Sequence, residues 1–471
     1  MSESYQNKAN ILFHNKKVLI LGLGINQGGL GATRFFATAG AKVRVTDLKS
    51  KEQLQVSLNA LKDFPDIEYV LGEHRFEDLD WADLIIKNPA LKPDNEYIKY
   101  AKEKGKDMEL DLGVFLQFVS PQQIIGVTGT KGKSTTASLI YEIIKAGGKE
   151  IVFAGNIGKS VFDTIPHVLS KTKGKVLQAS SKISSTASEA SSYVKKDTLV
   201  VLELSSAQLE AFDQHQISPR WAIITNIYPD HINFHGSMEN YIEAKKAIGK
   251  YQTKEDFLFL KKGDEVTNNS SFINGLRGQI TYFSKDDLPQ GFTPKLPGEH
   301  NLTNMAAALA VAQTLGIEQK TAIKVLENFK GVEFRLQLIY HHQGIKIYND
   351  TAATNPQATI EALQSLPNSI LIAGGVNKNL PYKKMAEAVS KYAKAVYFLE
   401  GTATDEILKD FPSDKNQEVY NNLEILLKDI KKIVQKGDVI LFSPGAASFN
   451  LFQNEFDRGR KFNQAVEKIF P

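Results

Sequence analysis

A glycine-rich loop between two apolar segments constrains this chain more than any other feature of its sequence. The loop runs from Thr128 to Thr135 and follows a β-branched apolar run that is typical of a buried strand. Apolar residues at helical spacing come next and end at the pair Gly147 and Gly148. A strand, a glycine turn and a helix in this order direct backbone N–H groups and the positive end of the helix at an anion. The sequence therefore predicts an α/β domain that holds a nucleoside triphosphate.

The residue types in the loop fit this chemistry. A lysine in this position reaches the terminal phosphates, and the hydroxyl that follows it binds Mg²⁺. The distance from Gly126 to Gly132 is one residue longer than the pattern GxxxxGK allows, but the loop fits the variant TGTxGK[ST]. A glycine turn with only a structural role is the alternative, and the flanking strand and helix argue against it. The residues expected to hold the triphosphate are Gly129, Thr130, Lys131, Gly132, Lys133, Ser134 and Thr135.

Length and composition indicate a globular protein of several domains. The chain has 471 residues, which at about 150 residues per domain suggests roughly three domains, each with its own core. Its net charge of +4 does not indicate a nucleic-acid-binding surface. The lack of cysteine excludes disulfides, thiolate metal sites and cysteine nucleophiles. A polar N-terminus and the absence of an apolar run of membrane-spanning length predict a cytoplasmic protein without a membrane partner.

The first third reads as a βαβ unit of the dinucleotide-binding type. A strand at residues 17–24 enters a glycine-rich turn, and a second strand ends in Asp47. Such a unit places a diphosphate at the turn and a hydroxyl or ring N–H donor on the acid. NAD and UDP-linked compounds both present these groups, so the pattern alone leaves both ligands open. A third strand at 83–86 leads into a loop with Asn88, which we expect beside the ligand; a simple connecting turn is the alternative.

Two strand-like runs of the central third end near candidate metal ligands. Glu203 lies near the carboxyl end of the run at 199–206, where ligands of α/β proteins gather, and a carboxylate there needs a partner or a metal. The run at 221–226 is followed by His231 and then by Lys245 in an apparent helix. By spacing alone these two residues favour ordinary structural and surface roles. Residues 168–197 are rich in Ser, Lys and Ala, which predicts an insertion that forms a mobile loop or a loosely attached helix on the surface.

The last part of the chain predicts a nucleotide-facing helix and a further sheet. Asn301 and Asn304 lie one helical turn apart, so both amides can address one polar ring, although Asn301 also suits a helix cap. Beyond residue 331 a hairpin around Gln343 and Gly344 precedes strands that alternate with helices. This alternation predicts another parallel sheet with covering helices. The expected domains are residues 1–119, 120–331 and 332–471.

The ordered motifs resemble the Mur ligase family, the ATP-dependent amide-forming enzymes of peptidoglycan precursor synthesis. The set is most similar to the members that add D-glutamate. The resemblance implies three domains: a Rossmann-like N-terminal domain for the UDP-linked substrate, a central ATPase domain of the P-loop type with a parallel sheet, and a C-terminal Rossmann-like domain that receives the amino acid. The markers are Thr128 to Thr135, Gly155 to Gly158, Leu202 to Ser206, Asp230-His231, Tyr241 to Lys245, Gly298 to Asn304, Phe334-Arg335, Asn349-Asp350 and Ser443 to Ser448.

The resemblance also implies a reaction, in which ATP phosphorylates the carboxylate of UDP-N-acetylmuramoyl-L-alanine and the amine of glutamate displaces phosphate. As catalytic residues it implies Lys133 at the β- and γ-phosphates, Ser134 and Glu203 at one Mg²⁺, and His231 with a carbamylated Lys245 at a second. We expect ATP and Mg²⁺ as cofactors, and a monomer. The further residues implied are Asn301, Asn304, Arg335 and Asp350 for ATP, Gly24, Ile25, Asn26, Asp47, Asn88 and Asn156 for the UDP-linked substrate, and Thr354, Lys378 and Ser448 for glutamate.

Three departures from the family pattern keep alternatives open. Ala352 stands where the family has a lysine near the phosphates, Glu455 stands where a phenylalanine is expected, and the segment between Asn156 and Glu203 is longer than usual. Ala352 and Glu455 leave open a related ligase that adds L-glutamate to the same nucleotide. Ala352 also leaves open a degenerate nucleotide-binding homologue without activity. An NAD-dependent dehydrogenase would explain residues 17–47 but would leave the phosphate loop unexplained.

Overall fold

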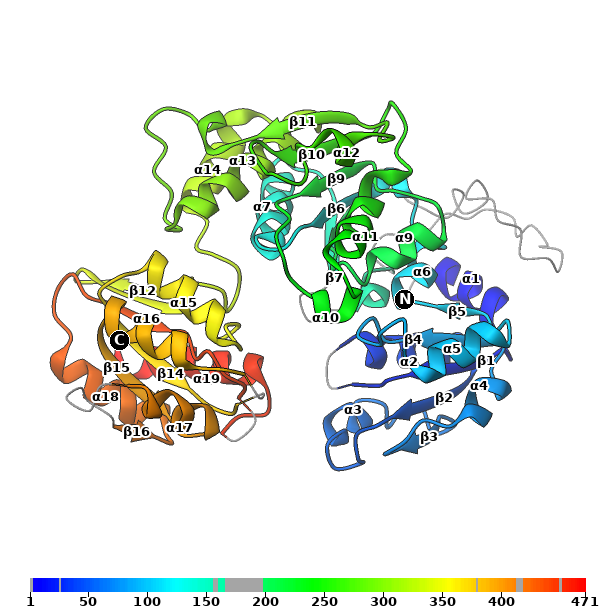
Figure 1. The fold of residues 1–471 in the computed structure, drawn as a ribbon, viewed down its shortest axis with the longest axis horizontal. Helices are drawn as coiled ribbons and strands as arrows, with labels where there is room; N and C mark the ends of the chain where they lie inside the picture. The colour runs from blue at the N-terminus through cyan, green and yellow to red at the C-terminus, as the bar shows by residue number, and fades with distance from the viewer. Residues whose placement is uncertain are drawn as a thin grey trace. The chain divides into compact units, whose positions relative to one another are not determined.

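The computed structural model describes residues 3–24, 27–155, 160–165, 198–377, 380–411, 418–448 and 451–471. The strands of these residues form three sheets, one in each third of the chain (Figure 1). The first two sheets lie in one compact unit, Met1–Pro289 with Leu302–Val325, and the third lies in another, Gln290–Asn301 with Leu326–Pro471. The predicted α/β fold with three domains is confirmed, whereas the exact domain boundaries stay predictions. The predicted insertion at 168–197 lies outside the described residues.

The N-terminal sheet has the order β3-β2-β1-β4-β5, with all neighbouring strands parallel. Alternate residues of β1 serve two cores: Val18 and Ile20 face one hydrophobic cluster, and Leu19 and Leu21 face another. This two-sided burial explains the continuous apolar run in the sequence. The elements are β1 (Lys17–Leu21), β2 (Lys42–Asp47), β3 (Glu68–Leu71), β4 (Leu84–Lys87) and β5 (Met108–Glu109), with helices α1 (Glu3–Phe13), α2 (Gln27–Thr38), α3 (Gln55–Asn59), α4 (Phe76–Trp81), α5 (Glu96–Glu103) and α6 (Asp111–Leu116).

The central sheet has the order β11-β10-β9-β6-β8-β7 and is also parallel. Aromatic packing joins it to the N-terminal domain, since the ring of Phe162 stacks on that of Phe35 with centroids 4.2 Å apart. The strands are β6 (Ile124–Thr128), β7 (Ile151–Gly155), β8 (Leu199–Glu203), β9 (Trp221–Ile224), β10 (Phe257–Lys261) and β11 (Gln279–Phe283). The helices of this part and of the chain that follows are α7 (Lys133–Ala146), α9 (Leu209–Gln214), α10 (Ile232–His235), α11 (Met238–Lys250), α12 (Ser270–Ile273), α13 (Glu299–Thr314) and α14 (Gln319–Asn328).

The C-terminal sheet has the order β12-β13-β17-β14-β15-β16, and only β12 and β13 pair antiparallel. Their hairpin turns at Gln343 and Gly344, with φ angles of 50° and 79°, as the sequence predicted. The strands are β12 (Gln337–His342), β13 (Ile345–Asn349), β14 (Ser369–Gly374), β15 (Ala393–Leu399), β16 (Val419–Tyr420) and β17 (Val439–Phe442). The helices are α15 (Pro356–Ser365), α16 (Lys383–Tyr392), α17 (Thr402–Lys409), α18 (Leu423–Ile433) and α19 (Glu455–Ile469).

Some predicted elements are shorter than expected. The first strand ends at Leu21 because Gly22 has a φ of 102°, and the run at 199–206 leaves the sheet after Glu203. In the part of the chain that the structure describes, no helix is long and apolar enough to cross a membrane.

Candidate active site

The phosphate loop has the predicted strand, turn and helix, and its glycines are required by close contacts. Gly129 and Gly132 have φ angles of 143° and 84°. A Cβ atom at Gly129 would lie 1.9 Å from Oγ1 of Thr225, and one at Gly132 would lie 2.4 Å from Oδ1 of Asn304. Asn226 supports the loop from the end of β9, because its backbone and side-chain oxygens accept the N–H groups of residues 130 and 131 at 2.9 Å. The loop is therefore held in shape by neighbouring strands before any ligand binds.

Lys133 is the first residue of α7, and its ammonium folds back on the loop. Its Nζ donates hydrogen bonds to the carbonyl oxygens of Gly129 and Thr130 at 3.0 and 3.1 Å. Phosphate oxygens are stronger acceptors for an ammonium than neutral carbonyls. A triphosphate in the loop would thus take over these contacts.

Ser134 and Glu203 form a buried pair beside the loop. The hydroxyl of Ser134 donates to Oε1 of Glu203 at 2.9 Å. Strands β6 and β8 are neighbours, with Val127 opposite Glu203, so the register of the sheet brings the carboxylate to the loop. Among the described residues, the second carboxylate oxygen, Oε2, is buried without a hydrogen-bond partner. A hydroxyl and an orphaned carboxylate oxygen are the donors that Mg²⁺ prefers, so these two residues fit the predicted metal site.

Lys245 lies under the same loop, on α11. Its side chain is 1% exposed, and its Nζ donates to the carbonyl oxygen of Gly129 at 2.9 Å. Lys133 donates to that same carbonyl, so the two amines lie close together. Burial and then the charge of Lys133 hold the pKa of the Lys245 amine well below its ordinary value. A lowered pKa favours the neutral, nucleophilic form of a buried lysine more than an exposed position would.

The structure places His231 differently from Lys245. The side chain of His231 is 62% exposed, and Nε2 lies 3.8 Å from Oδ2 of Asp230. The ring of Tyr241 packs near both predicted ligands, with the ring centroid 6.3 Å from that of His231 and 4.8 Å from Nζ of Lys245. The described residues contain no cluster of three or more His, Asp or Glu side chains suited to a metal ion. A second metal site at His231 and Lys245 therefore stays a prediction.

The two predicted adenine residues lie in the first turns of α13. Asn301 and Asn304 are 3% and 5% exposed. The side chain of Asn304 lies against Gly132 of the phosphate loop. The amide of Asn301 donates to the carbonyl of Pro297 at 2.5 Å. The structure thus brings Asn304 to the loop that the sequence assigned to ATP.

Two loops of the C-terminal domain carry residues predicted for ATP and residues predicted for the amino acid. Asp350 accepts hydrogen bonds from the hydroxyl of Ser443 at 2.7 Å and from the N–H of Leu336 at 3.0 Å, which ties the loop after β13 to the loop after β17. Burial raises the pKa of the Asp350 carboxyl to about 7. Ser448 is buried, and among the described residues its hydroxyl has no partner. Thr354 is half-buried just before α15. Arg335 precedes β12.

Arg458 is a buried residue beside these loops that the sequence did not predict. Its side chain is 0% exposed on α19. The guanidinium donates to the hydroxyl and carbonyl oxygens of Thr351 at 2.8 and 2.9 Å and to the carbonyl of Ala446 at 3.0 Å. It therefore clamps together the same two loops that Asp350 joins. The neighbouring Gly459 is the sequence signal, since a Cβ there would lie 2.6 Å from the side chain of Thr351.

The predicted UDP loops meet at the carboxyl edge of the N-terminal sheet. Asp47 accepts the N–H of Gly24 at 2.8 Å and that of Lys49 at 2.9 Å, so its carboxylate shapes the glycine turn. Asn88 lies against Gly22, where a Cβ would approach it to 3.2 Å. Ile25, Asn26, Asn156 and Lys378 lie outside the described residues.

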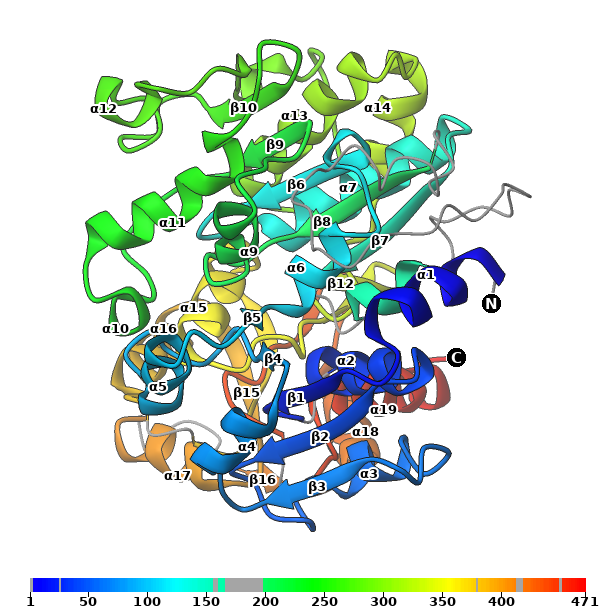
Figure 2. The same ribbon diagram turned by 90° about the vertical axis from the view of Figure 1, so that its right-hand side faces the viewer.

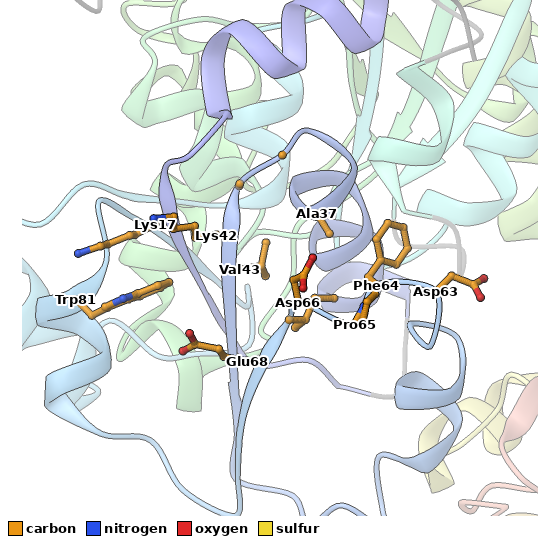
Figure 3. A pocket seen from close by; sticks show the side chains of 13 residues that line it. Lys17, Ala37, Lys42, Val43, Asp63, Phe64, Pro65, Asp66, Glu68 and Trp81 are labelled. Carbon is orange, nitrogen blue, oxygen red and sulfur yellow. The ribbon is translucent and has the colours of Figure 1, made fainter.

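A separate recess lies at the opposite edge of this sheet (Figure 3). It is lined by Lys17 and Lys42, the first residues of β1 and β2, and by Trp81. Ligands of parallel sheets bind at the carboxyl ends of the strands. This recess is therefore not a candidate for the substrate site.

Comparison with known proteins matches the chain to one family over most of its length. The Mur ligase middle domain matches residues 127–286, the Mur ligase glutamate ligase domain matches 334–445, and the MurD-like N-terminal domain of Mur ligases matches 16–109. A UDP-N-acetylmuramoylalanine--D-glutamate ligase of Roseiflexus sp. (strain RS-1) is 34% identical over 488 residues, covering 96% of this chain and 99% of the relative. This chain belongs to the Mur ligase family.

Further relatives and solved structures match this Mur ligase over nearly its full length. The enzyme of the same name from Clostridioides difficile (strain 630) is 32% identical, with 96% of this chain and 99% of the relative covered. Among solved structures, the UDP-N-acetylmuramate-alanine ligase MurC from Thermotoga maritima matches with a TM-score of 0.57 at 21% identity, over 96% of this chain and 99% of that chain. The MurF ligase from Thermotoga maritima in complex with ADP matches with a TM-score of 0.52 at 19% identity, over 98% and 97%. These two likenesses support the fold alone.

Family membership also bears on the competing interpretation of the first domain. The MurD-like match spans residues 17–47, the part of the chain that alone suggested NAD. In this Mur ligase the glycine turn and Asp47 are therefore explained by the family, and they no longer indicate an NAD-dependent dehydrogenase.

Proposed function

We propose that this Mur ligase joins D-glutamate to UDP-N-acetylmuramoyl-L-alanine with hydrolysis of ATP, as a cytoplasmic monomer. Relatives that match nearly the full chain carry that activity in their names. The observation that carries the proposal is the buried contact of Ser134 with Glu203, which leaves one carboxylate oxygen beside the phosphate loop without a partner among the described residues. A purely structural turn has no need of an orphaned buried carboxylate, whereas a magnesium nucleotide does.

In the proposed reaction the substrate carboxylate takes the γ-phosphoryl group of ATP, and the amine of glutamate then attacks the acyl phosphate and releases phosphate. Bound Mg²⁺ would neutralise charge on the phosphate oxygens. Lys133 would exchange the carbonyls of Gly129 and Thr130 for the β- and γ-phosphates. Ser134 and Glu203 would hold the metal. Asn301, Asn304, Arg335 and Asp350 remain our candidates for the rest of the nucleotide.

Lys245 has a separate proposed role. Only a neutral amine reacts with carbon dioxide, and burial beside Lys133 favours the neutral form of Lys245. The resulting carbamate would present oxygen atoms in place of the amine, which with His231 would suit a second Mg²⁺. Exposed His231 would have to turn toward Tyr241 to take part.

The acceptor side of the proposal rests on the C-terminal domain. The buried hydroxyl of Ser448, which has no partner within the described part of the chain, and the half-buried Thr354 are candidates for the carboxylates of glutamate. Lys378 is proposed for the side-chain carboxylate. The first domain would hold the UDP-linked substrate through Gly24, Ile25, Asn26, Asp47 and Asn88, with Asn156 from the central domain.

The test is phosphate release from ATP and Mg²⁺ with UDP-N-acetylmuramoyl-L-alanine, in the presence of D-glutamate, L-glutamate or neither, with the product mass recorded. Release with a matching mass gain for D-glutamate alone supports the proposal. Preference for L-glutamate would replace it with the related ligase that Ala352 and Glu455 left open. No release with either amino acid would refute a ligase with this acceptor.

A further inference from the structure

An ion pair with a buried lysine and a partly exposed glutamate, 34% exposed, joins the N-terminal and central domains. Lys87 is the last residue of β4 and is 2% exposed, and its Nζ lies 2.7 and 2.6 Å from the two carboxylate oxygens of Glu210. Glu210 lies in the first turn of α9, in the central domain. A buried ammonium is strongly disfavoured without its counter-charge. The pair therefore determines how the end of β4 meets α9.

A second contact holds the other end of the same helix. Nε2 of His215, the C-cap of α9, lies 3.0 Å from Oε1 of Glu109, the last residue of β5. Strands β4 and β5 are neighbours, so the two contacts seat one edge of the N-terminal sheet on both ends of α9. Figures 1 and 2 both show α9 next to α6, on the side of the central domain that faces β5 and β4. The sheet edge thus has little freedom to slide along the helix.

Both joined elements lead directly into the proposed site. Strand β4 continues into Asn88, in the loop proposed for the UDP-linked substrate. Helix α9 connects through residues 204–208 back to Glu203 at the end of β8. The ion pair therefore links the substrate loop of one domain to the metal-binding strand of the other.

We propose that Lys87 and Glu210 are positioning residues that set the distance between the UDP-linked substrate and the phosphoryl-transfer site. The inference rests on the proposed function. The pair acts through the loop that it anchors, because the substrate carboxylate must reach the γ-phosphate in line. A displacement of about 1 Å in such a geometry costs about 100-fold in rate.

The test compares Glu210→Gln, Lys87→Met, their double variant, and the swap Lys87→Glu with Glu210→Lys, all in the full chain. Each single variant should lower kcat by up to about 100-fold, because the substrate carboxylate is misplaced for in-line transfer. Each should also raise the KM for UDP-N-acetylmuramoyl-L-alanine about tenfold and leave the KM for ATP unchanged, because only the first substrate is held through β4. The double variant should be no worse than the worse single variant, and the swap should recover much of the loss.

The chain offers a matched control on the same helix. Lys250 and Asp213 form an ion pair of the same length, 2.7 Å, between α11 and α9, but both side chains are largely exposed, at 44% and 48%. Lys250→Met and Asp213→Asn should leave both KM values unchanged. An equal rise in both KM values for the Lys87 and Glu210 variants, or additive losses without recovery in the swap, would overturn the positioning role.

Hydrogen exchange of the full chain without nucleotide separates this inference from the proposed function. Peptides covering residues 84–90 and 204–215 should exchange faster in Glu210→Gln, return toward wild type in the swap, and stay unchanged in Lys250→Met. Unchanged exchange in Glu210→Gln would overturn the inference even in an active enzyme. A wild-type protein that is inactive with these substrates would refute the proposed function, and the exchange result would still decide whether the pair holds the domains together.

Discussion

Replacement of Asp350 by asparagine should stabilise the C-terminal domain, and more so at pH 8 than at pH 5. The carboxyl is buried against Ser443 and the N–H of Leu336, and burial raises its pKa from the ordinary 3.8 to about 7. Between these two values the folded state binds more protons than the unfolded state. The contribution of this carboxyl to the free energy of unfolding is therefore fully present below about pH 4 and is lost as the pH rises toward 7.

The size of the effect follows from the two pKa values. Above pH 7 the charged carboxyl lowers the free energy of unfolding by about 4 kcal/mol, and roughly 2–3 kcal/mol of this accrues between pH 5 and pH 8. Asparagine has the same shape, stays neutral and still offers an oxygen to the N–H of Leu336. The stability difference between variant and wild type should therefore grow by roughly 2–3 kcal/mol over this range.

The assay is hydrogen exchange of the amides in β13, β14 and β17, corrected for the intrinsic rate at each pH. Tryptophan fluorescence would miss the effect, because the only two tryptophans of the chain, Trp81 and Trp221, belong to the other compact unit. Asp405→Asn, at an exposed position on α17, serves as the control. A stability difference that is the same at pH 5 and pH 8 would refute the reasoning.

Four other substitutions test the candidate site. Gly132→Ala should abolish ATP turnover, because a methyl group at a φ of 84° would lie 2.4 Å from Asn304, and near-normal phosphate release would contradict this. Glu203→Gln keeps the shape and removes the charge, so the Mg²⁺ concentration for half-maximal rate should rise about tenfold or more; an unchanged requirement would exclude Glu203 as a ligand. Lys245→Ala should nearly stop ligation and regain activity with added short carboxylates. Failure of that rescue would count against a carbamate on Lys245. Arg458→Met should destabilise the C-terminal domain by about 3 kcal/mol or more, since three buried acceptors lose their donor; exchange rates equal to wild type would show that the loops do not need the clamp.

Many of the strands that the sequence predicted have continuous apolar runs. The run at 124–128 is buried throughout and the run at 199–203 is buried from Val200 on, as two-sided burial in a parallel sheet requires. The edge strand β12 was predicted from its hairpin turn instead. The strand Gln279–Phe283 was not predicted, because it lies at the edge of the central sheet and most of its side chains face solvent. Its apolar signal is too weak to separate it from a loop.

The residues of the candidate site also differ in how well the sequence predicted them. The phosphate loop was predictable because its glycines, lysine and serine are consecutive in the chain. His231 and Lys245 could be assigned only through the family resemblance, and the structure buries the lysine while it exposes the histidine. Lys87 gave no signal, since a single charged residue in a sequence is usually a solvated one. The signal for Arg458 is indirect and lies in the neighbouring Gly459.

The sequence by itself determined the local chemistry: a triphosphate loop between a strand and a helix, alternating strands and helices in three domains, and the family to which the motifs belong. These features depend on neighbouring residues and on the period of apolar side chains. Only the tertiary structure decided which distant residues meet. The register of β6 against β8 brings Glu203 to Ser134, and the packing of β4 on α9 pairs Lys87 with Glu210. Burial then sets the chemistry that these charges can support, because the free energy of a carboxylate or an ammonium depends on the water and the partners that the fold leaves around it.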